Sequence, residues 1–205
     1  CLIEPALAPA DARLSALYDD HTRGSRLAAQ LCQILARRVG LPESGAMVTA
    51  AVLSYVGHMA MLAMRTPEAS LLDAGKDFLE RSQHEQDEVG IAAGVLGCLL
   101  LEAWNMPVAI VEDVRQIDLV VTTPPKQLSA QKATRYALTY YCVRVADKLA
   151  AGTWADLEAA VPERLVGPEF FHAQTHFMAD PKLAQLAVEM RTPQVVDEVQ
   201  RLLRA

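Results

Sequence analysis

Two histidines four residues apart form the clearest local pattern with chemical meaning. His172 and His176 would share one face of a helix, which is the spacing of half a zinc site. The residues between them are Ala173, Gln174 and Thr175, so the glutamate of the metalloprotease pattern HExxH is missing. We therefore expect a packing or surface role for this pair.

Nucleophilic catalysis has little support in the sequence. No GxSxG turn is present, so a serine nucleophile elbow is not predicted. The four cysteines are Cys1, Cys32, Cys98 and Cys142, and they form neither a CxxC pair nor a zinc spacing. The last three fall in apolar helical stretches, where we expect buried free thiols in a reducing compartment. The sequence thus predicts no catalytic residue, no metal and no cofactor.

The composition narrows the class of protein further. The chain has 205 residues, 52% of them hydrophobic, and a formal net charge of -6, which disfavours binding to nucleic acid. Two largely apolar stretches, 47–64 and 91–111, are interrupted by polar residues such as His58 and Glu102. A membrane-spanning helix needs about 20 apolar residues without such interruptions, so we expect core helices. Without a signal-peptide pattern at the start, we expect a cytoplasmic protein away from the membrane.

Hydrophobic periodicity predicts an all-α fold. Apolar residues recur every three or four positions, and no segment alternates polar and apolar residues between turn signals. Gly40, Pro67, Pro107 and the run 122–125 separate the periodic stretches. Pro193 is expected at the first position of the last helix. The first predicted helical stretch begins near residue 11, with an apolar pattern at 14–21 and a next one at 27–39. Further helical pieces are predicted at 46–64, 71–79, 85–104, 108–120, 129–150, 154–160, 170–178 and 181–204, the last helix starting at 192–193.

Four short motifs occur in a characteristic order. They are LYDDHT at 17–22, AVLSYVG at 51–57, the series Gly90, Gly97, Trp104 with Met106-Pro107, and VADKLA at 145–150. This series resembles that of the HDOD domain, a signalling domain related to the HD-type phosphohydrolases. The resemblance covers roughly residues 14–152 and implies a multi-helix bundle of the HD-like type.

The resemblance also allows the metal ligands of HD-type phosphohydrolases to be checked one by one. His21 matches the first histidine and Asp147 the final aspartate, while the central His-Asp pair is replaced by Ser54 and Tyr55. The next histidine position holds Ala93, and the later histidine pair falls near 117–118, where Asp118 is a possible extra oxygen ligand. Neither serine nor tyrosine is a usual substitute for a chelating pair, so we predict no hydrolytic metal site. His21 and Asp147 are instead expected to form a buried hydrogen bond between two helices, with a residual ligand contact as the alternative.

The resemblance implies a function as well as a fold. We expect a loosely ordered N-terminus (1–12), the HDOD domain (13–152) and a helical extension packed on it (153–205). The favoured role is non-catalytic signal transduction of the bacterial type, through a partner protein or self-association. An apolar patch or groove on the surface would agree with this role.

Two other functions remain open at the level of sequence. One is a sensor of a nucleotide or metabolite. Its ligand would sit in the degenerate HD cavity, for which the candidate pocket residues are His21, Ser54, Tyr55, His58, Asp118 and Asp147. The other is a residual metal-dependent phosphohydrolase that uses His21, Asp118 and Asp147.

Overall fold

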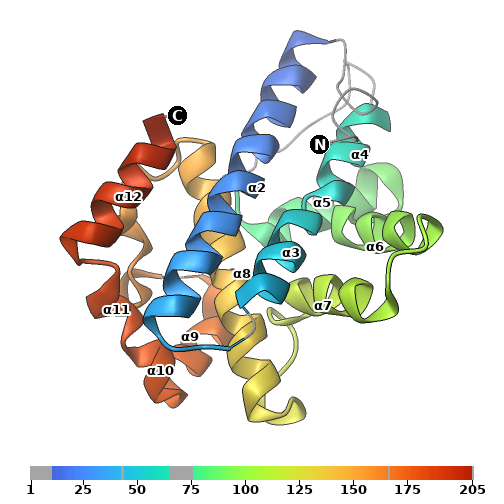
Figure 1. Ribbon diagram of the computed structural model, residues 1–205. Coiled ribbons are helices and arrows are strands. Elements are labelled where there is room, and N and C mark those ends of the chain that lie inside the picture. The colour runs from blue at the N-terminus through green and yellow to red at the C-terminus, as the bar shows by residue number, and fades with distance from the viewer. Residues whose placement is uncertain (1–10, 43, 65–75, 166, 205) are drawn as a thin grey trace.

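The fold is known from a computed structural model, which describes residues 11–42, 44–64, 76–165 and 167–204 (Figure 1). These residues form helices joined by turns, with no strand among them, so the predicted all-α multi-helix bundle is confirmed. The predicted loose N-terminus and the helix at 71–79 fall mostly outside the described residues. The α-helices are α2 (Ala12–Arg38), α3 (Ser44–Leu53), α4 (Val56–Met64), α5 (Phe78–Val89), α6 (Ala93–Ala103), α7 (Val108–Leu119), α8 (Ala130–Ala150), α9 (Phe171–Ala179), α10 (Pro181–Ala184), α11 (Leu186–Glu189) and α12 (Pro193–Arg204).

Helices α2 and α8 pack along each other through the middle of the bundle (Figure 1). Helices α3 to α7 lie on one side of this pair and α9 to α12 on the other. Every residue of α8 from 136 to 150 is buried, so this helix has no solvent-facing stripe. Cys32 of α2, Cys98 of α6 and Cys142 of α8 are free thiols. Cys32 and Cys142 are fully buried and Cys98 is 5% exposed, which confirms the predicted core positions.

Local sequence signals account for both ends of α2. The side chain of Asp11 accepts hydrogen bonds from the backbone N–H groups of Arg13 and Leu14, as an N-cap residue does. At the other end, Gly40 has φ 67° and Leu41 donates its N–H to the carbonyl of Ala36. This is a Schellman ending, and its left-handed residue is best supplied by glycine.

The predicted single helix at 46–64 is wrong, because a turn at Ser54 and Tyr55 divides it into α3 and α4. The Ser54 hydroxyl donates to the carbonyl of Ala51 at 2.8 Å. The Tyr55 ring points into the core, and its hydroxyl donates to the carbonyl of Val143 on α8 at 3.2 Å. Packing against α8 therefore decides where this break falls.

The predicted helix at 85–104 also divides, into α5 and α6, and the predicted start at 85 is wrong because α5 begins at Phe78. Gly90 ends α5 in the left-handed conformation, with φ 81°. The first turn of α6 has no side-chain cap of its own, because Ala92 stands at the cap position. Glu85 of α5 supplies the missing acceptor, since its Oε2 accepts the N–H of Ala93 at 2.7 Å.

The C-terminal residues from 153 onward share the core of the bundle. Leu183, Met190, Val195 and Val199 are buried in the same hydrophobic cluster as α2 and α8. The predicted helical piece at 181–204 consists of α10, α11 and α12, and Pro193 opens the last of these as predicted.

One segment of the described residues has features of a membrane-spanning helix. Ser44–Met64, which contains α3 and α4, is long and apolar enough to cross a membrane by length and composition. Its most apolar window is 61% buried inside the bundle, however, and a core helix passes the same test. This is weak evidence for a membrane span.

Candidate functional site

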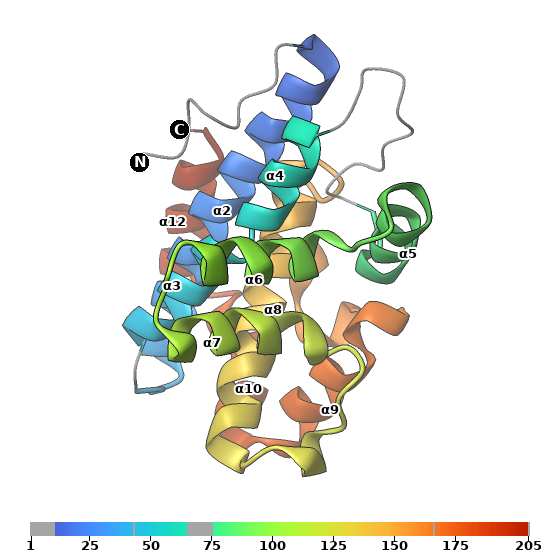
Figure 2. The ribbon, with the colours of Figure 1, turned by 90° about the vertical axis from the view of Figure 1, so that its right-hand side faces the viewer.

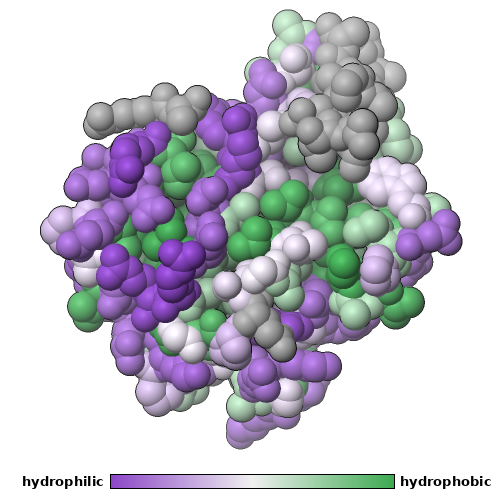
Figure 3. Space-filling model, viewed as in Figure 1, coloured by the Kyte–Doolittle hydropathy of each residue, from purple (hydrophilic) through white to green (hydrophobic). Residues whose placement is uncertain are grey.

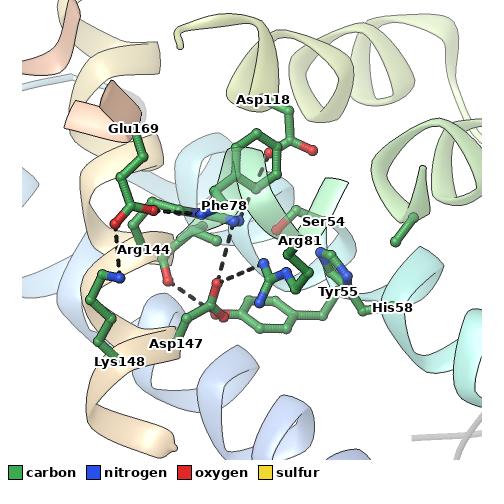
Figure 4. Close-up of polar contacts among 12 residues, drawn as sticks. Ser54, Tyr55, His58, Phe78, Arg81, Asp118, Arg144, Asp147, Lys148 and Glu169 are labelled. Carbon is green, nitrogen blue, oxygen red and sulfur yellow. Dashed lines mark hydrogen bonds and ion pairs between the residues drawn. The ribbon is translucent and has the colours of Figure 1, made fainter. Parts of the chain in front are cut away.

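By the resemblance, Asp147 matches the final aspartate ligand in the metal site of HD-type phosphohydrolases. This residue of α8 is 3% exposed, and its Oδ2 accepts a hydrogen bond from Arg81 Nη2 of α5 at 3.2 Å (Figure 4). Arg144, one helical turn earlier, places its Nη1 3.4 Å from the same oxygen. Burial by itself would raise the pKa of Asp147, but the two guanidinium groups outweigh it and lower that pKa to about 2. Asp147 is therefore an ionised carboxylate held between two cations.

Two stacked histidines lie beside this ion-pair cluster. His21 of α2 and His58 of α4 have ring centroids 5.0 Å apart and planes inclined by 11°. Tyr55 contacts both rings edge-on. Burial, and then the proximity of His58 and Arg81, hold the pKa of His21 well below its ordinary value. His21 is consequently neutral at physiological pH.

Glu85 links the histidine pair to α6. Its Oε1 lies 3.6 Å from His58 Nδ1, while its Oε2 accepts the N–H of Ala93. Burial alone would raise the pKa of Glu85, but His58, Arg81 and the Ala93 N–H lower it to about 2. Each carboxylate oxygen of Glu85 thus has a partner, His58 at Oε1 and the Ala93 N–H at Oε2.

The predicted hydrogen bond between His21 and Asp147 is not formed. His21 Nδ1 and Asp147 Oδ1 are both buried without a hydrogen-bond partner. Asp147 binds Arg81 instead, so its side chain links α8 to α5 and not to α2. A guanidinium competes effectively here because its fork reaches the carboxylate with a full positive charge.

The six candidate pocket residues separate into two groups. His21, Ser54, Tyr55, His58 and Asp147 are buried, and Ser54 and Tyr55 use their hydroxyls on backbone carbonyls. Asp118 of α7 is partly exposed, with 22% of its side chain accessible, and it lines a cavity of about 420 Å³ between α5, α6 and α7. Only its Oδ1 approaches the buried cluster, at 3.8 Å from Arg144 Nη2.

Three important residues of this cluster were missed in the sequence. Arg81 and Glu85 lie in the charged run 80–88, which reads as a solvated helix face, yet both are buried. Arg144 is buried as well, and its guanidinium carbon lies 4.4 Å from the ring centroid of Phe78. The one available signal was an arginine inside the stretch 136–146, whose other residues are hydrophobic apart from Thr139.

The residues present do not fit the metal of an HD-type phosphohydrolase. Such a metal needs several ligands at once, and the described part of the chain holds no group of three or more His, Cys, Asp or Glu side chains that could bind one. The positive charges of Arg81 and Arg144 stand against Asp147 and would repel a divalent cation. His176 is buried with Nε2 unpaired and likewise belongs to no such group.

Comparison with known families agrees with the motif order. The family model of the HDOD domain matches residues 10–119, which is more than half of the chain. The chain belongs to the HDOD domain family. The match spans α2 to α7 and ends before α8, which carries Asp147. Neither the curated proteins nor the solved structures include a significant match. The HDOD family is associated with signalling, which is consistent with a regulatory role for this protein.

Proposed function

We propose that this HDOD protein is a non-catalytic regulatory domain of a cytoplasmic, bacterial-type signalling system. It acts by binding a partner protein or a second copy of itself. Hydrolysis of phosphate esters is not part of this proposal.

The arginine pair around Asp147 carries the argument against hydrolysis. A metal-dependent hydrolase needs a site with surplus negative charge, so that a divalent cation can bind and lower the pKa of its water. Here the one carboxylate that matches a family ligand is neutralised by Arg81 and Arg144 within 3.4 Å. Its charge stabilises the fold and is not available to a metal.

The surface supports a role in protein–protein interaction. Figure 3 shows hydrophobic side chains gathered over α3, α4 and α6. Val52 of α3, Trp104 at the end of α6 and Val108 at the start of α7 are all exposed, Val108 to 84%. Exposed apolar patches of this kind mark interaction sites on soluble proteins.

Hydrolysis is tested on the full chain with chromogenic phosphomonoester and phosphodiester substrates. Magnesium, manganese or ferrous iron is added, and a chelator serves as the control. We expect no rate above the chelated control with any of these metals. Metal-dependent hydrolysis that the chelator abolishes would overturn the proposal.

Association is tested by sedimentation velocity over a range of protein concentrations. Val108→Asp changes an exposed valine on the side of the bundle that carries α6 and α7. Val188→Asp is the matched control, because Val188 is 67% exposed on α11 in the C-terminal part. We expect the first change to weaken association and the second to leave it unaltered. Equal effects of the two variants would assign no special role to the apolar surface.

A further inference from the structure

A cavity of about 420 Å³ lies between α5, α6 and α7. Figure 2 shows α6 and α7 facing the viewer and α5 to their right. This volume falls within the range of small-molecule sites. Three helices contribute apolar walls, so the cavity is held by packed elements and not by a loop alone. The main apolar lining residues are Phe78, Ala92, Val95, Cys98, Leu99 and Leu119.

One carboxylate, that of Asp118, lies in this apolar wall with 22% of its side chain accessible. Its Oδ1 is buried beside Arg144 Nη2, 3.8 Å away, so Oδ2 is the oxygen that a ligand in the cavity can reach. The Oδ2 atom lies against α6, where a Cβ on Gly94 would approach it to 2.2 Å. Glycine at position 94 therefore provides the space that the carboxylate occupies.

The other charged residue of the cavity is already neutralised. Arg115 at the rim donates to Glu102 at 2.6 Å and to Glu112 at 2.8 Å. Asp118 is thus the charged residue of the lining that leaves an oxygen, Oδ2, open to a ligand, while Arg144 on its buried side balances part of its charge. Burial raises the pKa of Asp118, and Arg144 opposes that rise only in part. A cationic group in the cavity would donate a charge-assisted hydrogen bond to Oδ2.

We propose that this cavity binds a small, mainly apolar molecule that carries one protonated amine. The apolar part lies against Val95, Leu99 and Leu119, and the ammonium group donates to Asp118. This site goes beyond the proposed function and does not depend on it, because that function is association with a protein, whereas this cavity takes a small molecule. It also touches the ion-pair cluster, since Phe78 and Asp118 both contact Arg144.

Three probes with the same six-carbon chain test the chemistry: hexylamine, hexanol and hexanoate. Binding to the full chain is measured by isothermal titration calorimetry and by ligand-observed NMR. We expect hexylamine to bind about tenfold more tightly than hexanol, which is the value of one charge-assisted hydrogen bond. Hexanoate should bind most weakly, because its carboxylate meets that of Asp118.

Two variants and a control locate the site. Asp118→Asn should bring the affinity for hexylamine down to that for hexanol. Leu99→Lys places an ammonium group in the cavity from a half-exposed position and should weaken both ligands. Val188→Lys, on the exposed face of α11, should change neither affinity.

Three results would overturn the proposal. In the first, hexylamine binds no more tightly than hexanol to the unaltered protein. In the second, Asp118→Asn keeps the preference for the amine. In the third, Leu99→Lys leaves amine binding intact but changes the sedimentation of the protein, which would assign the cavity to contact between two copies of the protein.

Discussion

Replacement of Asp147 by asparagine should leave two buried guanidinium groups without their shared carboxylate. Arg81 and Arg144 are each about 3% exposed, so water cannot take over the role of the lost charge. Removal of one partner from a buried ion pair costs about 3–5 kcal/mol, because the remaining charge stays desolvated. We expect Asp147→Asn to lower the free energy of unfolding by that amount.

The pKa of Asp147 gives an independent magnitude. It is about 2 in the folded protein, against the ordinary value of 3.8. A lowered folded pKa means that the stabilisation is fully present above the ordinary value and is lost as the pH falls toward 2. The shift corresponds to a stabilisation of about 2–3 kcal/mol, of the same order as the estimate from the buried pair.

The assay is urea denaturation followed by circular dichroism at neutral pH. Glu102→Gln is the matched control, because it makes the same change from carboxylate to amide in an exposed ion pair with Arg115. Such surface pairs contribute less than about 1 kcal/mol. If Asp147→Asn cost no more than Glu102→Gln, the interpretation of Asp147 as the centre of a buried ion-pair cluster would be refuted.

Three further outcomes are expected. Gly57→Ala should lower the free energy of unfolding in urea by several kcal/mol or prevent folding, because its Cβ would lie 1.8 Å from the Ala93 carbonyl oxygen. The control Gly45→Ala, with open space around it, should be neutral or stabilising by up to about 1 kcal/mol. Stability should fall as the pH drops below 6.5, since unfolding lets His21 take up a proton that the fold disfavours; a His21→Phe variant should show a shallower slope, and an unchanged slope would contradict this. Burial raises the pKa of Cys142, so a maleimide should label it only after denaturation; rapid labelling of the native protein would argue against its buried position.

The sequence by itself determined the helical class and most helix ends. Periodicity located α7 and α8. Local signals set both ends of α2 and the start of α12, because Asp11, Gly40 and Pro193 act through neighbours only a few residues away. The motif order identified the family before any tertiary contact was known. It also singled out Asp147, which proved to be the centre of the buried cluster.

Tertiary structure decided the helix breaks and the chemistry at the site. The turn at Tyr55 depends on the carbonyl of Val143, and the start of α6 depends on the carboxylate of Glu85, contacts that no local pattern reports. The partners of Asp147 were hidden for the same reason. An arginine on a helix reads as solvent-exposed until packing encloses it, and only the crossing of α5 with α8 brings Arg81 to Asp147 and gives the carboxylate a cation of the protein's own.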